Sequence, residues 1–549
     1  MSSPDVPQVS LDDARVLVSA ADALLEPVLE KARAATDGGK TIDDHQVLSE
    51  RVAYAATERR AAREAVALLD EASAEGRPTG AFQDVAVAAV ADLVANLKNR
   101  LDPILPELGL GDEELDAAFP AEVRARLRAG ESPELLREIG RRAIEARGRT
   151  EPPLDEMLEQ VRDSVREFAE NEVTPHAEFI HREDKDIPEA FITKMGELGY
   201  FGLSIPEEYG GHEMGNLAMI LTTEELSRAS LAGAGSLITR PEILTKALLQ
   251  GGTEEQKKQW LPQLASGETM VGVAVTEPDV GSDVAAVKCR ATRTDDGWRI
   301  DGPKAWCTFA GRANVLSLLA RTDPDLSKGQ KGLSLFIVPK GSYPGHEFED
   351  QQEGGGRLVG KADATPGYRG MHSFTLNFEN YHVPAENLVG GEAGLNRGFY
   401  LQMGGFAAGR LQTGGRGCGL AQAALEETAK YVVDRQQFGI PISDFQLTQY
   451  TLGRMATRVF EARAITYAAA LAMDENERAA APLAAQAKLL ACDLAVDVTQ
   501  QGMLMHGGWG YAEEYPISRY VVDAQVLPIF EGVKPILELR VIARALLAS

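Results

Sequence analysis

The spacing of hydrophobic residues changes twice along the chain, and this change restricts the folds that it can adopt. From Leu154 onward, apolar residues recur every three or four positions, as they do along one face of a helix. At Val271 they begin to alternate with small or polar residues, which is the two-residue period of a β-strand. Helical spacing returns near Gly398 and continues along the rest of the sequence. The sequence therefore predicts a mainly α-helical protein with a central β-domain.

Residues 1–150 are expected to form an additional helical module. They are rich in Ala, Leu, Glu and Arg, contain almost no aromatic residues and show no strand-like alternation. No residues in this module have catalytic spacing, so we interpret it as a docking or spacer element, and docking to a partner protein is an open alternative. The predicted parts are an N-terminal helical extension (1–150), a helical domain (151–270), a central β-domain (271–390) and a C-terminal helical bundle (391–549).

Proline and glycine residues mark the expected breaks between elements. The helix that begins near Leu154 is expected to end before Thr174-Pro175, because proline disfavours helical geometry in the residue before it. A later helix is expected over residues 234–250, with Pro241 disrupting it. The glycine-rich run 352–357 has no strand–turn–helix context, so it indicates a surface loop and not a nucleotide-binding loop.

The composition excludes several classes of partner. With 549 residues, 44% of them hydrophobic, and a formal net charge of −26, the chain would repel the phosphates of nucleic acids and of anionic membranes. No apolar run reaches the roughly 20 residues that span a bilayer, and the acidic N-terminus is unlike a signal peptide. The four cysteines and eight histidines lack metal-ligand spacing. We expect a cytoplasmic protein without a metal site, nucleic-acid partner or membrane insertion.

One strand leads into a loop of unusual composition. Val271, Val273 and Val275 alternate with small residues, and the strand then meets Thr276-Glu-Pro followed by Gly281-Ser-Asp283. Proline fixes the backbone there, and the loop is rich in backbone donors and short polar side chains. Such a strand end suits a flat polar ligand. An ordinary strand followed by a solvated turn is the alternative.

Three further short stretches accompany this loop. They are Trp306-Cys-Thr308, the run Arg435-Gln-Gln-Phe-Gly439 with Gln446 shortly beyond it, and Phe530-Glu-Gly532. Each is weakly specific alone. Together with the order helices, strands, helices, they make the chain from about residue 154 resemble the acyl-CoA dehydrogenase family.

The resemblance implies a fold, a cofactor and a reaction. The fold would comprise a helical domain, a β-barrel-like domain and a C-terminal four-helix bundle, to which this chain adds the N-terminal module. The cofactor would be FAD, and the reaction the α,β-desaturation of an acyl-CoA thioester. The resemblance also implies an electron-transferring flavoprotein as acceptor and a homodimer or homotetramer that shares the FAD site between subunits.

The reaction explains which residue types are needed. Desaturation removes an α-proton and a β-hydride, and the flavin accepts the hydride. The protein must supply a base for the α-proton. The resemblance assigns this role to Glu531, whereas an acidic residue in the first turn of the last helix is the alternative. Some relatives carry the base just before the position of Arg410, where this chain has Gly409, which cannot serve.

The resemblance also assigns binding residues. The flavin contacts would come from Val273, Val275, Thr276, Ser282, Trp306 and Thr308, and from Arg435, Phe438, Gln446, Gly507 and Gly508 of a neighbouring subunit. The substrate contacts would come from Ser282, Arg240, Arg410 and Phe530. The alternatives are a core tryptophan at Trp306, a capping threonine at Thr308 and a solvated arginine at Arg410.

Three positions depart from the family pattern. Relatives commonly have Thr-Asn-Gly where this chain has Thr308-Phe-Ala310, and Glu-Gly-Thr where it has Glu531-Gly-Val533. A glutamine that usually precedes the paired glycines is replaced by Leu504. The flavin contacts at Phe309, Leu504 and Val533 are therefore left open.

In its extra module, its length and these departures, the chain most resembles the family members that oxidise methylsuccinyl-CoA. Such a substrate has a free carboxylate, and burying it without a partner would be costly. The helix expected over residues 234–250 should line the acyl pocket, so we predict that Arg240 binds this carboxylate, with a surface salt bridge as the alternative. A short or branched apolar acyl-CoA is an open alternative substrate. A non-dehydrogenating flavoprotein or DNA-associated relative is another, which Glu531 and the net charge disfavour.

Overall fold

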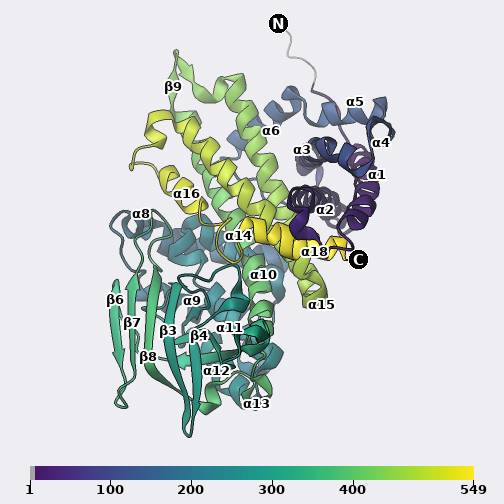
Figure 1. Cartoon of the computed structure of the whole chain (residues 1–549). Helices are drawn as coiled ribbons and strands as arrows, with labels where there is room; N and C mark the ends of the chain where they lie inside the picture. The colour runs from purple at the N-terminus through teal and green to yellow at the C-terminus, as the bar shows by residue number, and fades with distance from the viewer. Residues whose placement is uncertain (1–5, 549) are drawn as a thin grey trace. The chain divides into compact units, whose positions relative to one another are not determined.

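The computed structural model describes residues 6–548, which form two compact units (Figure 1). Unit 1 combines the two ends of the chain, up to Asp163 and from Thr413 onward. Unit 2 is the continuous stretch Ser164–Gln412. The predicted mainly α-helical architecture with a central β-domain is confirmed.

Helices open unit 2. They are the end of α7 (Glu156–Phe168), α8 (Thr174–Arg182), α9 (Glu189–Glu197), α10 (Gly215–Ala229), α11 (Thr239–Gly251) and α12 (Glu254–Ala265). The predicted break before Thr174 is wrong, because α7 continues through a π-helical turn, Ala169–Val173, directly into α8. Pro175 lies in the first turn of α8, directly after this π-helical turn.

The start of α11 also differs from the prediction. A π-helical turn, Leu231–Gly235, precedes it, and the helix begins at Thr239 instead of residue 234. Pro241 therefore lies in the first turn of α11 and does not disrupt it. Arg240 is fixed at the beginning of a regular helix.

The central sheet has eight strands in the order β1-β4-β2-β3-β8-β7-β6, with β5 paired to β4 (Figure 1). Its strands are β1 (Val271–Ala274), β2 (Arg290–Thr294), β3 (Gly297–Thr308), β4 (Val315–Arg321), β5 (Leu333–Pro339), β6 (Glu347–Gln351), β7 (Arg357–Ala362) and β8 (Ser373–Pro384). β1 and β4 are parallel, whereas β3 and β8 are antiparallel. The predicted loop at 352–357 is the connection between β6 and β7.

Apolar side chains of α11 and α12 pack beside the sheet. Leu248 and Leu261 belong to one buried cluster with Val271 of β1 and Ile337 of β5. A second cluster includes Trp298 of β3 and Phe378 of β8. The two clusters fix the end of β1, where the polar loop begins. A short helix, α13 (Gly391–Gly394), follows the sheet.

Unit 1 contains the N-terminal module and the C-terminal bundle. The module consists of α1 (Leu11–Ala35), α2 (Gln46–Ala74), α3 (Gln83–Leu101), α4 (Asp112–Ala118), α5 (Ala121–Gly130) and α6 (Pro133–Glu145). The later elements are the part of α14 (Gly398–Asp434) from Thr413 onward, the short strands β9 (Gln436–Gln437) and β10 (Ile440–Pro441), α15 (Gln446–His506), α16 (Ile517–Ala524), α17 (Lys534–Ile536), a π-helical stretch (Leu537–Ala543) and α18 (Arg544–Leu547). α15 is kinked at Asn476, between the two helices that the sequence predicts there.

The N-terminal module packs tightly against α15. A Cβ atom added to Gly140 of α6 would lie 1.8 Å from the carbonyl oxygen of Gln449, and one added to Gly453 of α15 would lie 1.8 Å from that of Leu136. Only glycine permits this approach of two helix backbones. The module is therefore an integral part of unit 1.

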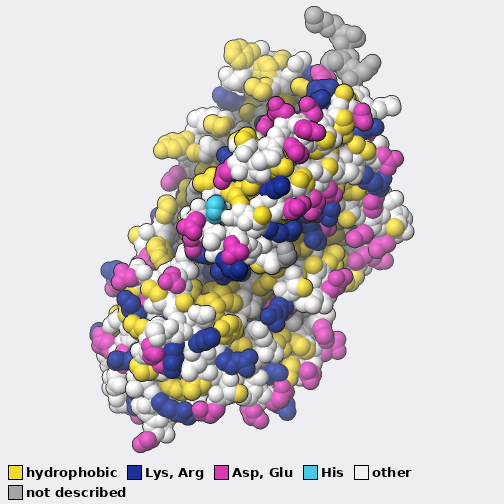
Figure 2. Space-filling view, turned by 45° about the vertical axis from the view of Figure 1, so that its right-hand side comes forward, with side chains coloured by type: hydrophobic (Ala, Val, Ile, Leu, Met, Phe, Trp, Pro, Cys, Tyr) yellow, Lys and Arg dark blue, Asp and Glu magenta, His cyan; other side chains and the backbone are white. Residues whose placement is uncertain are grey.

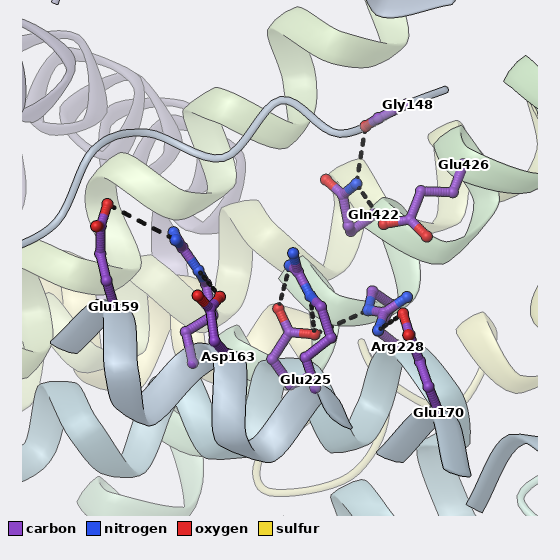
Figure 3. A network of polar contacts seen from close by, with 10 residues as sticks. Gly148, Glu159, Asp163, Glu170, Glu225, Arg228, Gln422 and Glu426 are labelled. Carbon is purple, nitrogen blue, oxygen red and sulfur yellow. Dashed lines mark hydrogen bonds and ion pairs between the residues drawn. The ribbon is translucent and has the colours of Figure 1, made fainter. Parts of the chain in front are cut away.

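A polar contact also holds the segment that follows α6 (Figure 3). The Gln422 side chain donates hydrogen bonds to the carbonyl oxygen of Gly148 at 2.8 Å and to Glu426 at 2.9 Å. Gln422 and Glu426 lie on α14, so this contact ties the end of the module to the C-terminal bundle.

The apolar residues of α15 are those of a core helix. Among the described residues, Gln446–Gly510 is the one helical stretch long and apolar enough to cross a membrane, with a mean hydropathy of 1.3, but 67% of its most apolar window is buried in the protein. On the face shown in Figure 2, acidic and basic side chains are interspersed.

Candidate active site

The structure brings two of the predicted flavin-binding stretches together in unit 2. The backbone N–H of Ala305 donates a hydrogen bond of 2.8 Å to the carbonyl oxygen of Thr276. The loop that follows β1 therefore lies beside Trp306 on β3. Thr276 is half-buried, and Ser282 is exposed farther along the same loop. Val273 is half-buried and Val275 is buried, so the strand itself is anchored in the core.

Trp306 projects from the sheet. The pairing of β3 with β8 shifts register between Lys304 and Cys307, and Trp306 there has φ +58° and an exposed fraction of 60%. A bulge redirects a side chain in this way. The alternative of a core tryptophan is therefore wrong. An exposed indole next to a polar strand end provides a surface on which a flat ring packs.

Thr308 and Phe309 lie immediately beyond the bulge. The hydroxyl of Thr308 is 3.0 Å from that of Ser373 on β8, so Thr308 is a strand residue and not a helix cap. Phe309 is buried, with φ +67°, and its N–H donates to the carbonyl oxygen of His372 at 2.8 Å. The Phe309 side chain thus fills the interior at one of the three positions that depart from the family pattern.

A buried ion pair that the sequence analysis missed supports this loop. Lys304 has an exposed fraction of 0%, and its Nζ donates to Glu277 Oε1 at 3.0 Å and to the carbonyl oxygen of Val275 at 2.8 Å. The Glu277 carboxylate also accepts the backbone N–H groups of Lys288 and Cys289, at 2.9 and 2.7 Å. The pair fixes both sides of Thr276. Lys304 lies between Pro303 and Ala305 on β3, and Glu277 follows the valine-rich strand β1, so only these short apolar surroundings marked the pair in the sequence.

Arg240 is buried at the beginning of α11. Its exposed fraction is 4%, and its Nη2 lies 3.3 Å from the hydroxyl of Tyr368, which is also buried. The predicted alternative of a surface salt bridge is therefore wrong. On the same helix, buried Glu242 accepts a hydrogen bond from Ser204 and lies 3.7 Å from Lys246. A group of polar side chains thus occupies the apolar interior at this end of α11.

Other charged residues of unit 2 stabilise its helices (Figure 3). Arg166 of α7 forms a two-pronged contact with the buried carboxylate of Glu225 on α10, at 2.6 and 3.1 Å. Arg228 joins Glu225 at 2.8 Å and Glu170 at 2.9 Å.

The predicted substrate residue Arg410 is half-buried on α14, where it follows the buried Gly409.

The Phe530-Glu531-Gly532 turn belongs to unit 1 and precedes α17. Glu531 has φ +55° and Gly532 has φ +101°, so both residues adopt backbone conformations that side chains disfavour. Glu531 therefore lies outside the helix, and the alternative of a residue in its first helical turn is wrong. Val533 is at the N-cap of α17 and makes no side-chain capping hydrogen bond.

Two buried cations contact this turn. Lys488 of α15 donates from Nζ to the carbonyl oxygen of Gly532 at 2.5 Å. The guanidinium carbon of Arg416, on α14, lies 4.6 Å from the centre of the Phe530 ring. Both cations are almost fully buried. They hold the backbone and the aromatic side chain on either side of Glu531.

The remaining predicted flavin residues lie at the surface of unit 1. Arg435 and Gln446 are exposed next to the β9–β10 hairpin, and Phe438 at its turn has an exposed fraction of 95%. Gly507 and Gly508 are also exposed, and a Cβ atom on either would meet nothing within 4 Å. Their lack of a side chain is therefore not required by packing within the chain. Leu504, which replaces the usual glutamine, is exposed near them.

The helical domain, curled sheet and C-terminal helical domain form the fold of the flavin-dependent acyl-CoA dehydrogenases. Three family models match the chain: Acyl-CoA dehydrogenase, N-terminal domain, over residues 155–268; middle domain, over 272–381; and C-terminal domain, over 396–547. The chain belongs to the acyl-CoA dehydrogenase family, whose members are FAD-dependent oxidoreductases acting on CH–CH groups.

Individual relatives cover different parts of the chain. (2S)-Methylsuccinyl-CoA dehydrogenase of Cereibacter sphaeroides is 36% identical over 553 residues, which cover 97% of this chain and 98% of that protein. The structure of a glutaryl-coenzyme A dehydrogenase with glutaryl-CoA has a TM-score of 0.66 and 33% identity, and the match covers 72% of this chain and 97% of that one. A chain in the structure described as the electron transferring flavoprotein of Acidaminococcus fermentans has a TM-score of 0.66 and 32% identity, covering 73% and 100%.

Proposed function

We propose that the protein catalyses the FAD-dependent α,β-desaturation of (2S)-methylsuccinyl-CoA to mesaconyl-CoA, as a cytoplasmic enzyme of the ethylmalonyl-CoA pathway. The observation that carries this proposal is the match over 97% of the chain to a dehydrogenase of that name, because the match includes the N-terminal module. An electron-transferring flavoprotein is the proposed acceptor, which the structural similarity to a chain described with such a protein supports.

The residues of unit 2 around the end of β1 and the bulge of β3 fit a flavin, with Ser282 and Trp306 exposed, Thr276 half-buried and Thr308 buried. Thr276, Ser282, Trp306 and Thr308 would hold it, with Val273 and Val275 as the strand beneath, and the bound flavin supplies the acceptor for the β-hydride. Trp306 offers a ring face to a planar group, and the Lys304–Glu277 pair keeps the Thr276 backbone fixed.

A second subunit is proposed to complete the flavin site. Phe438 is 95% exposed and makes an edge-to-face contact with Phe445, and a Cβ atom on Gly507 or Gly508 would meet nothing within 4 Å among the described residues. Arg435 and Gln446 are exposed beside the same hairpin. These residues suit contact with the flavin of a neighbouring copy, so we propose a homodimer or homotetramer.

Glu531 is the proposed base. Its carboxylate would remove the α-proton of the thioester, and the surrounding turn presents it in a fixed conformation. Phe530 and Arg410 are proposed to contact the acyl-CoA, and Ser282 to contact both flavin and thioester.

Arg240 is the proposed partner of the distal carboxylate. Its guanidinium is buried beside the Tyr368 hydroxyl, and a buried arginine can pair two-pronged with a carboxylate. The match to a glutaryl-CoA complex supports a substrate of this chemical class.

Replacing Arg240 by methionine tests this assignment. We expect kcat/KM for methylsuccinyl-CoA to fall roughly 10- to 100-fold, because a charged hydrogen bond contributes about 1.5–3 kcal/mol. The value for butyryl-CoA should stay the same or rise, since that substrate has no carboxylate to pair. Arg290→Ala, which removes an exposed arginine of the same unit, is the control. An equal loss for both substrates would show that Arg240 acts on the fold and not on the carboxylate.

The overall proposal is tested by a panel of thioesters. With an electron-transferring flavoprotein as acceptor, we expect the highest kcat/KM for (2S)-methylsuccinyl-CoA and a product lighter by two hydrogens. Isobutyryl-CoA tests the apolar alternative: a higher kcat/KM for it would assign the protein to a branched apolar substrate.

A further inference from the structure

We propose that the N-terminal module positions the turn that carries Glu531, through Tyr54 acting on Asp493 and Lys534. The inference rests on the proposed function in one respect, namely that Glu531 is the base. It gives the additional helices a role in the reaction, through contacts that all lie within unit 1.

Tyr54 connects the module to the residue that closes the turn. It lies on α2 with an exposed fraction of 6%, and its hydroxyl donates to Asp493 Oδ2 of α15 at 2.6 Å. The same carboxylate oxygen accepts from Lys534 Nζ at 2.5 Å. Lys534 Nζ is also 5.0 Å from the centre of the Tyr54 ring, within the range of a cation–π contact. Two donors from distant parts of the chain therefore meet at one carboxylate.

Lys534 in turn determines the geometry of the base. Its backbone N–H donates to the carbonyl oxygen of Pro528 at 2.9 Å, which closes the loop that contains Glu531. A non-glycine residue in the left-handed region is disfavoured by roughly 1–2 kcal/mol and persists only where its surroundings hold it. Two residues of α15 hold the turn: Lys488 donates to the Gly532 carbonyl oxygen, and Asp493 pairs with the side chain of Lys534.

The departure from the family pattern at Val533 agrees with this arrangement. Val533 occupies the N-cap of α17 and cannot form the side-chain hydrogen bond that a threonine there would make. The start of α17 is fixed instead by the contact of Lys534 with Asp493 and Tyr54. The module thereby supplies a support that the local sequence lacks.

Tyr54 is itself held in place by the module. The guanidinium carbon of Arg100, on α3, lies 4.0 Å from the centre of its ring, and Arg100 pairs with Glu58 of α2 at 2.9 Å. Burial, followed by the nearby Asp493 carboxylate, raises the pKa of Tyr54 well above its ordinary value. The hydroxyl therefore remains a hydrogen-bond donor to Asp493 throughout the working pH range.

The test uses Tyr54→Phe in the full-length, FAD-loaded enzyme. We expect the rate of flavin reduction by substrate to fall about tenfold with KM little changed, because a small displacement of a catalytic group costs that much or more. The pH dependence of this rate should shift relative to the parent enzyme. Amide hydrogen exchange in the peptide covering residues 528–536 should become faster, which reports on the turn independently of turnover. Arg63→Ala is the matched control, because Arg63 is exposed on the same helix α2 and pairs with Asp22 of α1.

A double-mutant cycle shows whether Tyr54 acts through Lys534. If it does, Tyr54→Phe combined with Lys534→Met reduces the rate no further than Lys534→Met alone, and Lys534→Arg retains most of the activity. Parental rate, pH dependence and hydrogen exchange in Tyr54→Phe would overturn the inference, as would fully additive effects. Glu531→Gln distinguishes failure of the positioning role of Tyr54 from failure of the proposed base. If Glu531→Gln is inactive while Tyr54→Phe has the parental rate, only the positioning role fails. If Glu531→Gln retains the parental rate, the proposed base itself is wrong.

Discussion

Glu531→Gln is expected to reduce the rate of flavin reduction by acyl-CoA about 10⁴-fold, near the upper end of what a general base contributes. Glutamine has the shape of glutamate but cannot accept the α-proton. The measurement is anaerobic mixing of enzyme and thioester with detection of flavin absorbance. FAD content and thermal stability should match those of the parent, since the contacts of Lys488 with Gly532 and of Arg416 with Phe530 remain.

Glu514→Gln, an exposed substitution earlier in the same region, is the control and should reduce flavin at the parental rate. Glu531→Asp should retain intermediate activity because it keeps a carboxylate but shortens its reach. If Glu531→Gln reduced flavin within tenfold of the parental rate, the base would have to be another residue.

Lys304→Met is expected to have the largest effect on stability. It leaves the Glu277 carboxylate buried without its cation, and breaking a buried pair in this way costs about 3–5 kcal/mol. Because Glu277 also holds the backbone at Lys288 and Cys289, the loop carrying Thr276 should loosen and FAD affinity should fall. Denaturant unfolding and FAD titration measure the two effects.

The double variant Lys304→Met with Glu277→Gln should recover part of the lost stability, since it removes the isolated charge. Lys361→Met disrupts an exposed pair with Glu347 and should change the free energy of unfolding by less than about 1 kcal/mol. A loss of stability for Lys304→Met as small as that of the exposed control would mean that the buried pair does not support the loop.

The order of helices and strands was predictable because each domain keeps one hydrophobic period. The strand signal of β6 is weak, because one of its two buried positions is the charged residue Asp350. The break predicted before Thr174 failed because a π-helical turn accommodates the proline at the beginning of the next helix. The proline rule predicts the backbone preference of one residue. Whether the helix ends there also depends on the conformation of the turn next to it.

The sequence predicted individual residues of the candidate site but not the contacts that hold them. Motif residues such as Trp306 and Glu531 could be found from short patterns, but their left-handed backbone conformations could not. The supporting contacts join residues far apart in the sequence, as with Lys488 and Gly532 or Tyr54 and Asp493. No periodicity brings such pairs together, because they depend on how complete helices pack.

The most direct measurement is anaerobic flavin reduction by (2S)-methylsuccinyl-CoA compared with isobutyryl-CoA. We predict rapid bleaching of the flavin by methylsuccinyl-CoA, formation of mesaconyl-CoA in equal amount, and slower bleaching by isobutyryl-CoA. Faster reduction by isobutyryl-CoA would contradict the proposed substrate, and absence of bleaching by any acyl-CoA would contradict the proposed dehydrogenation itself.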